Sequence, residues 1–187
     1  MAKLALRELL LLLISLAAAT QGVQALNAES WAIRLETQKE TVTNLQFYFH
    51  DTLSGSNPSA VRVAQANNTD KSPTFFGSLM MADDPLTESP DPKSKLLGYA
   101  QGLYGSACQT DVGLLMAMNF EFVDGSYNGS SISLLGKNSA LHPVREMAIV
   151  GGTGLFRLAR GYAIAQTNWL NPLTGDAIVG YNVTIVH

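Results

Sequence analysis

The sequence predicts an all-β fold, and two observations carry that prediction. Large and small side chains alternate with a period of two in several segments, most regularly from Phe156 to Gln166. This period indicates a strand, because successive side chains of a strand point to opposite faces of a sheet. Stretches rich in Pro, Gly, Asn, Asp and Ser separate these segments and mark turns. Several strands with turns between them predict a β-sandwich or a β-barrel.

Nine segments are candidate strands. They cover residues 42–51, 61–66, 74–82, 96–106, 112–122, 130–135, 146–151, 157–168 and 177–186. The stretches SGSNPS, ANNTDKSP, DDPLTESPDPKS and NWLNPLTGD are predicted to be turns. Small and large residues alternate along the 96–106 segment, which suits a curved, closed sheet. The glycines within 151–154 are expected to form a tight hairpin turn, with Arg145 at the mouth of that hairpin.

The first 25 residues are predicted to be a secretory signal peptide. Lys3 and Arg7 precede an apolar run, and small residues follow the run up to Ala25. The run is shorter than the about 20 residues that a bilayer-spanning helix needs, so we expect a secreted, soluble protein with no membrane association. Residues 26–40 have no clear strand pattern and are predicted to form a flexible N-terminal arm. Residues 41–187 are predicted to form one β-domain.

Composition narrows the function classes. The formal net charge is −3 and there are no basic runs, so a nucleic-acid partner is not expected. Cys108 is the only cysteine, so no internal disulfide can form, and stability must come from the core and from subunit packing. For Cys108, a partly buried thiol near a strand end is favoured over a disulfide between chains or a redox role.

On the secretory route, the sequons at Asn67, Asn128 and Asn182 are predicted glycosylation sites, with Asn182 the least favoured because it lies inside a candidate strand.

The segment Leu45–Asp51 carries the first candidate site residue. Its alternation places Asp51 on the same face as Phe49 and two other large apolar side chains. Inside a barrel, loss of solvation would raise the pKa of Asp51 and make it a usable general acid. The alternative is an aspartate at a strand end that turns toward solvent or caps the following Thr52–Gly55 turn. The residues alone favour that alternative.

Arg145 and Tyr104 are the next candidates. Arg145 lies at the beginning of a predicted strand. Two interpretations are open: it forms a solvated ion pair with a nearby carboxylate, or it binds the oxygen atoms of an aromatic ligand. Tyr104 and Tyr99 both carry a hydroxyl that can donate a hydrogen bond beside an aromatic ring.

Other chemistries are not favoured. Gly151–Gly154 lacks the helix and the Lys-Ser/Thr ending of a phosphate loop. The three histidines are far apart without ligand spacing, so neither a metal nor a cofactor is expected.

Five ordered motifs make the chain resemble the plant dirigent protein family. They are LQFYFHD at 45–51, GYAQGLYG at 98–105, LLMAMNFEF and YNGSSISLLGKN within 114–138, and VREMAIVGGTGLFRLARGYA from Val144. The resemblance covers almost everything after residue 40. It implies an eight-stranded antiparallel β-barrel that forms homo-oligomers, with a trimer favoured over a dimer. It also places Asp51, Tyr104 and Arg145 in the pocket as catalytic groups and leaves Tyr99 to the core.

The resemblance further implies a function in lignan and phenylpropanoid biosynthesis. A separate laccase or peroxidase makes phenoxy radicals from a monolignol such as coniferyl alcohol, and the dirigent protein directs their coupling in the apoplast. Phe49, Asp51, Tyr104, Asn138 and Arg145 are the predicted substrate contacts. Orientation alone is the contribution expected of the barrel, so no oxidative activity of its own is required.

Asn138 departs from the pattern of the family members that form pinoresinol, which resemble one another in carrying an Asp in a Gly-Ala-Asp-Pro motif. An amide cannot supply the proton that a carboxylic acid can, although it still forms hydrogen bonds. The Gly136-Lys137-Asn138-Ser139 variant resembles another branch of the family, in which a pterocarpan-forming dehydratase activity occurs. A lyase that acts through a quinone methide is therefore the alternative. A non-catalytic wall or carbohydrate-binding function is weaker, because the chain has only Trp31 and Trp169 to form a planar aromatic face.

Overall fold

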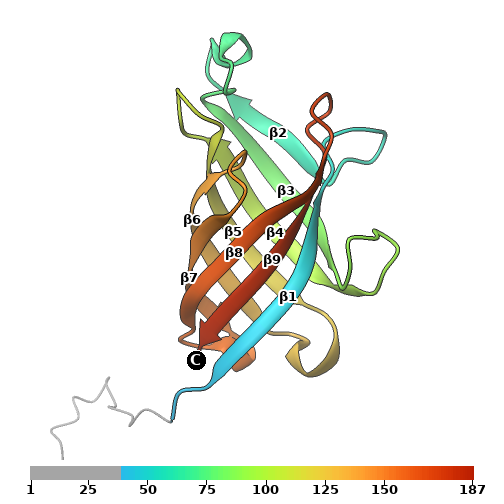
Figure 1. Cartoon of the computed structure of the whole chain (residues 1–187), viewed down its shortest axis with the longest axis vertical. Helices are drawn as coiled ribbons and strands as arrows, with labels where there is room; N and C mark the ends of the chain where they lie inside the picture. The colour runs from blue at the N-terminus through green and yellow to red at the C-terminus, as the bar shows by residue number, and fades with distance from the viewer. Residues whose placement is uncertain (1–38) are drawn as a thin grey trace, which may run out of the picture. The chain divides into compact units, whose positions relative to one another are not determined.

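Nine antiparallel strands wind into a barrel in the computed structural model, which describes residues 39–187 (Figure 1). The strands are β1 (Val42–Asp51), β2 (Ala60–Gln65), β3 (Ser78–Thr87), β4 (Leu96–Ser106), β5 (Gly113–Phe122), β6 (Ser131–Ser139), β7 (Arg145–Thr153), β8 (Arg160–Leu170) and β9 (Ala177–Val186). Short 3₁₀ turns lie at Thr69–Lys71 (η1), Gly125–Tyr127 (η2) and Gly154–Phe156 (η3). The predicted signal peptide, residues 1–25, and nearly all of the predicted arm, residues 26–40, lie outside the described residues. Within the described range, no helix is long and apolar enough to cross a membrane.

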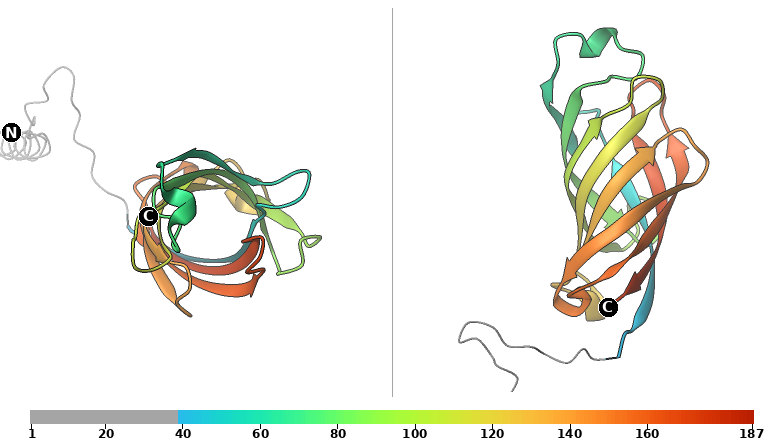
Figure 2. Two further views of the ribbon diagram at one scale, coloured as in Figure 1. Left: turned by 90° about the horizontal axis from the view of Figure 1, so that it is seen from above. Right: turned by 90° about the vertical axis from the view of Figure 1, so that its left-hand side faces the viewer.

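The barrel has eight strand positions, as expected, because β1 and β2 occupy one position in succession. Each strand from β3 to β9 pairs with its neighbour in sequence, and β1 pairs along its whole length with β9. The ring closes where Tyr48 and Phe49 of β1 pair with Thr87 and Leu86 of β3. β2 pairs with the other half of β3, from Ala82 to Ser78. Figure 2 shows the closed ring from above.

Two predicted turns begin inside strands. The first three residues of NWLNPLTGD belong to β8, and the larger error concerns β3. The stretch that begins Asp83-Asp84-Pro85 continues the strand as far as Thr87. Pro85 has no N–H to donate and is tolerated in strands only at edges or interruptions. It lies at such an interruption, because pairing with β1 ends at Leu86 and pairing with β2 begins at Ala82.

The glycine-rich segment also differs from the prediction of a tight hairpin turn. Gly151 and Gly152 belong to β7, and the chain then makes the 3₁₀ turn η3 before β8 begins at Arg160. Within 151–154 only Gly154 has a positive φ, +61°, which a glycine adopts without strain. The longer connection buries Phe156 completely in the interior.

Aromatic side chains fill one end of the barrel interior. Phe47 stacks on Tyr181 with ring centroids 5.7 Å apart, and Phe120 packs edge-on against both rings. The expected core position of Tyr99 is wrong, because its side chain is only half-buried, on the outward side of β4. Tight packing between strands explains the small residues of β4, since a Cβ atom at Gly98 would collide with the Glu121 carbonyl oxygen. The opposite end of the barrel is not filled in this way.

Candidate functional site

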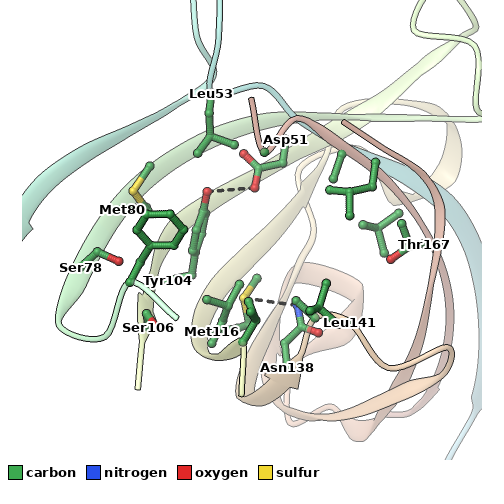
Figure 3. A pocket seen from close by; sticks show the side chains of 18 of the residues that line it. Asp51, Leu53, Ser78, Met80, Tyr104, Ser106, Met116, Asn138, Leu141 and Thr167 are labelled. Carbon is green, nitrogen blue, oxygen red and sulfur yellow. Dashed lines mark hydrogen bonds between the residues drawn. The ribbon is translucent and has the colours of Figure 1, made fainter. Parts of the chain in front are cut away.

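A cavity of about 360 Å³ occupies that other end of the barrel interior (Figure 3). Its walls are mostly apolar, and the buried ring of Tyr181 lies between it and the aromatic core. All five residues predicted to contact substrate line it: Phe49, Asp51, Tyr104, Asn138 and Arg145. They come from four different strands, β1, β4, β6 and β7, so closure of the barrel is what brings them together.

Asp51 and Tyr104 form the polar group on one wall. The Tyr104 hydroxyl donates a hydrogen bond of 2.9 Å to Asp51 Oδ2. Asp51 Oδ1 is buried and has no hydrogen-bond partner among residues 39–187. Burial raises the pKa of Asp51 to about 6, although the hydrogen bond from Tyr104 acts in the opposite direction. Asp51 is therefore largely in its acid form under mildly acidic conditions.

The alternative position for Asp51, as a cap on the following turn, is taken by another residue. Asp176, immediately before β9, accepts hydrogen bonds from the backbone N–H groups of Leu53 and Ser54 and from the Ser54 hydroxyl. These bonds hold the loop that follows β1 and keep the pKa of Asp176 below its usual range. Asp51 is thus left to face the cavity.

Arg145 belongs to a second polar group across the cavity. It is 5 % exposed and donates from Nε to Asn138 Oδ1 at 3.1 Å. Its Nη1 donates to Thr167 Oγ1 at 2.8 Å and to the His142 carbonyl at 3.2 Å. Every one of these acceptors is neutral, so the solvated ion pair considered for Arg145 does not form among the described residues. Asn138 in turn points its amide nitrogen at Met116 Sδ, 3.9 Å away.

The charge of Arg145 remains available to a ligand because none of those partners neutralises it. Burial lowers the pKa of its guanidinium, which still carries a charge at any physiological pH. A buried cation without a counterion attracts electron-rich oxygen atoms strongly in an apolar cavity. The site therefore combines a carboxylic acid with a hydroxyl on one wall and an uncompensated cation on the other.

Sequence reasoning missed two residues of this region. Thr167 holds Arg145 and lines the cavity; it lay inside the predicted strand at 157–168, but a single threonine there gave no signal of a site. Asp84 is fully buried on the inner side of β3, next to the site. The period of two could have predicted that Asp84 faces inward, because it shares a face with Ser78, Met80, Ala82 and Leu86. Pro85 indicated a turn instead.

The remaining predicted sites lie elsewhere. Asn67, Asn128 and Asn182 are all exposed, and Asn182 lies in β9 as expected. Cys108 is half-buried just after β4, which matches the favoured environment. His50 is buried and shares a 2.6 Å hydrogen bond with Thr87 Oγ1.

Comparison with known sequences identifies the family of this barrel. The sequence profile of the Dirigent-like proteins matches residues 42–186, which span all nine strands. The chain belongs to the dirigent family. It is 64% identical over 182 residues to Dirigent protein 23 of Arabidopsis thaliana, an alignment that covers 97% of this chain and 96% of that protein. It is also 50% identical over 151 residues to Pterocarpan synthase 1 of Glycyrrhiza echinata, covering 80% of each chain.

Solved structures of the family share the barrel. A pterocarpan synthase dirigent protein superposes with a TM-score of 0.75 at 47% sequence identity, covering 82% of this chain and 88% of the other. The eight-stranded antiparallel dirigent barrel is therefore confirmed. Membership of the family implies phenolic substrates, which suits an apolar cavity with a few oriented polar groups.

Proposed function

We propose that this dirigent protein is secreted and directs the stereochemistry of coupling between phenoxy radicals. A separate laccase or peroxidase makes the radicals from a monolignol such as coniferyl alcohol. The observation that carries the proposal is the pair of polar groups, Asp51 with Tyr104 and Arg145 with Asn138, on different walls of one apolar cavity. This arrangement holds an aromatic ring between apolar side chains while its oxygen atoms contact groups of known position.

Orientation is the main contribution of such a site. A radical bound in one pose exposes one face, and holding reactants in the productive geometry removes most of the entropic cost of their encounter. Arg145 binds the phenolic or methoxyl oxygens, and its hydrogen bonds to Asn138 and Thr167 fix the guanidinium plane. Phe49 and Tyr181 contact the ring from the apolar side.

Asp51 acts when the coupled product, a quinone methide, closes its rings. The Asp51 acid gives its proton to the quinone methide oxygen, and a substrate hydroxyl attacks the electrophilic carbon and releases a proton. One proton is consumed and one is released, so the step needs no external acid. The raised pKa of Asp51 supplies the acid form that this step requires.

A dehydratase activity is the second candidate, and Asn138 is the observation that favours it. The proton donor of the site is then Asp51 alone, since the amide of Asn138 cannot supply a proton. Asp51 protonates a benzylic hydroxyl, water leaves, and a phenol of the same molecule loses its proton to give a quinone methide. A neighbouring phenol adds to that quinone methide, which takes up a proton. Relatives that carry the name pterocarpan synthase, about half identical in sequence, support this alternative.

We also propose that the protein is a homo-oligomer, with a trimer favoured over a dimer. Six outward-facing apolar residues form one row across neighbouring strands β3 to β8. They are Met81, Leu103, Ala117, Leu135, Ala148 and Tyr162, each paired with the next. Met81, Leu135 and Tyr162 are each more than 40 % exposed, and the row includes no charge. A second copy of the same barrel covers such a row at low desolvation cost.

The extracellular location belongs to the proposal as well. The predicted signal peptide at 1–25 directs the chain to the apoplast, where laccases or peroxidases generate the radicals. The exposed positions of Asn67, Asn128 and Asn182 suit glycosylation on that route.

The deciding experiment is chiral analysis of the products from coniferyl alcohol and a laccase, with and without the purified protein. An enantiomeric excess that depends on the protein is expected for radical guidance. Asp51→Asn should abolish it, whereas Asp83→Asn, the same change on the exposed side of β3, should not. A racemic product in every mixture would rule out guidance of this monolignol. An isoflavanol that forms a pterocarpan without oxidant would then establish the dehydratase instead.

A further inference from the structure

Asp84 is a buried carboxyl group that the proposed mechanism does not yet use. Its side chain is 0 % exposed on the inner side of β3. Ser59 Oγ donates a hydrogen bond to Asp84 Oδ1, while Oδ2 is buried and has no partner among residues 39–187. A buried acceptor without a partner loses its hydration without compensation, so such atoms are rare in folded proteins.

Strand register places Asp84 opposite Asp51. Phe49 of β1 pairs with Leu86 of β3, and two further residues along each antiparallel strand lead to Asp51 and Asp84. Both side chains belong to the inward-facing sets of their strands. Asp51 Oδ1 is the other buried oxygen without a partner. The two unsatisfied carboxyl oxygens therefore belong to facing positions on adjacent strands.

The break between β1 and β2 creates this juxtaposition. The chain leaves the barrel wall after Asp51 and returns at Ser59, whose carbonyl accepts from the Asp83 N–H. The Ser59 hydroxyl also accepts from the Thr52 N–H at 3.0 Å. Ser59 thus joins the two ends of the loop to the strand that carries Asp84.

We propose that Asp84 is a positioning residue that stores a proton for Asp51, the two carboxyl groups forming a pair that shares one proton. The inference rests on the proposed function, because it supplies the acid that quinone methide chemistry uses. When Asp51 gives a proton to the substrate oxygen, the proton held by Asp84 restores the acid form of Asp51. The proton released by the attacking substrate hydroxyl then restores Asp84, so the cycle is balanced.

Electrostatics agree with the geometry. Burial, reinforced by the charge of Asp51, raises the pKa of Asp84 to about 8, while that of Asp51 is raised to about 6. Two like charges in one buried site cannot both form readily, so the proton of the pair is retained between these values. Between these values the proton lies mainly on Asp84 and is available to Asp51, whereas a lone Asp51 would have no such reserve.

Several titratable groups on the neighbouring elements surround the pair. They are Tyr104 on β4, Tyr181 on β9, Asp176 before β9, Asp83 on the outer side of β3, and Arg145, which acts on Tyr181. Arg62 of β2 pairs with the exposed Asp70 instead. Burial raises the pKa of both tyrosines, so their hydroxyls stay protonated throughout the relevant range.

Proton titration tests the pair without any substrate. Carboxyl ¹³C resonances of aspartate-labelled full-length protein are followed by NMR from pH 4 to pH 10. Two raised steps, near pH 6 and near pH 8, are expected in the wild-type protein. Asp84→Asn should remove the upper step, and the exposed control Asp83→Asn should keep both, with the upper step only slightly lower because the Asp83 charge contributes least to it. Absence of any step above pH 7 in the wild-type protein, or an upper step that survives in Asp84→Asn, overturns the proposal.

Activity against pH supplies the second readout. As the pH is raised, the wild-type protein and Asp83→Asn should lose their enantiomeric excess near pH 8. Asp84→Asn should lose it near pH 6. An unchanged profile in Asp84→Asn overturns proton storage. If no substrate reacts, the proposed function fails, while the titration still decides whether the pair exists. Should Asp84→Asn fail to fold, Asp51→Asn replaces it, because removing the Asp51 charge must shift the upper step to lower pH.

Discussion

The Tyr104 hydroxyl and Asp51 Oδ2 are joined by a 2.9 Å hydrogen bond that connects β4 to β1 across the intervening strand β3. Their strands are not neighbours in the sheet, so the two side chains meet inside the barrel. Curvature of the barrel brings the two side chains together inside the cavity (Figure 3). The bond favours the ionised carboxylate, while burial favours the acid, and burial has the larger effect.

Replacing Tyr104 by Phe should therefore raise the pKa of Asp51 further above about 6, by about one pH unit. The acid form then persists to higher pH, and the pH at which activity is lost should rise with it. The measurement is the ¹³C titration of Asp51 together with the pH profile of enantiomeric excess. Tyr99→Phe removes a hydroxyl from the outward side of the same strand and should change neither. A lowered Asp51 pKa in Tyr104→Phe would contradict the prediction.

Asn138→Asp should stabilise the protein at neutral pH. Arg145 is buried beside neutral acceptors, and a carboxylate at 138 would provide a counterion and a charge-assisted hydrogen bond, about twice as strong as a neutral one. The free energy of unfolding at pH 7 is expected to rise by about 1–2 kcal/mol. The arginine holds the pKa of the new carboxyl low, so the gain is present above the pKa of an unfolded aspartate and is lost as the pH falls.

Urea unfolding at pH 7 and at pH 3 measures this change. Asn119→Asp introduces the same charge on the exposed side of β5 and should leave the stability nearly unchanged. A less stable Asn138→Asp at pH 7 would mean that desolvation of the new carboxylate outweighs its attraction to Arg145.

Local patterns predicted most strand positions because one face of each strand is buried and the other is not. The alternation through Phe49 placed Asp51 on the inner face, but could not decide between the cavity and the turn that follows. Only Asp176, more than 120 residues away in sequence, settles that question by capping the loop itself. Such long-range competition for hydrogen bonds leaves no trace in a local pattern.

Asp84 was missed for a related reason. Asp-Asp-Pro normally indicates a turn, and Pro85 does lack a donor for a continuous ladder. The strand continues because the interruption between β1 and β2 lies beside it, and that interruption is a property of barrel closure. The proximity of Asp84 to Asp51 could be predicted only after the closing register was known.

The raised pKa values of Asp51 and Asp84 predict how stability depends on pH. The folded protein binds more protons than the unfolded chain between about pH 4 and pH 8, so the free energy of unfolding should fall as the pH rises through this range. Asp84→Asn should remove much of this dependence and raise the free energy of unfolding at pH 8 by on the order of 2–5 kcal/mol. Thermal unfolding at pH 5, 6.5 and 8 measures it, with Asp83→Asn as the control. A wild-type protein that becomes more stable from pH 5 to pH 8 would contradict the burial of ionisable carboxyl groups at these positions.

The apolar row on the outside of the barrel leads to a prediction about assembly. Leu135 lies in the row between Ala117 of β5 and Ala148 of β7, and 49 % of its side chain is exposed. Leu135→Glu would place a charge in the interface between copies, where burying an unpaired carboxylate costs several kcal/mol. The variant should be a monomer under conditions where the wild-type protein is expected to be a trimer, with an unchanged fold because the side chain points away from the core.

Light scattering after size-exclusion chromatography measures the molar mass of both proteins, and circular dichroism checks the fold. Leu158→Glu is the matched control, since Leu158 is 81 % exposed on the turn between β7 and β8, away from the row. It should retain the wild-type mass. A wild-type protein that is monomeric at micromolar concentration, or a Leu135→Glu variant that keeps its full mass, would show that copies of the chain do not associate through this row.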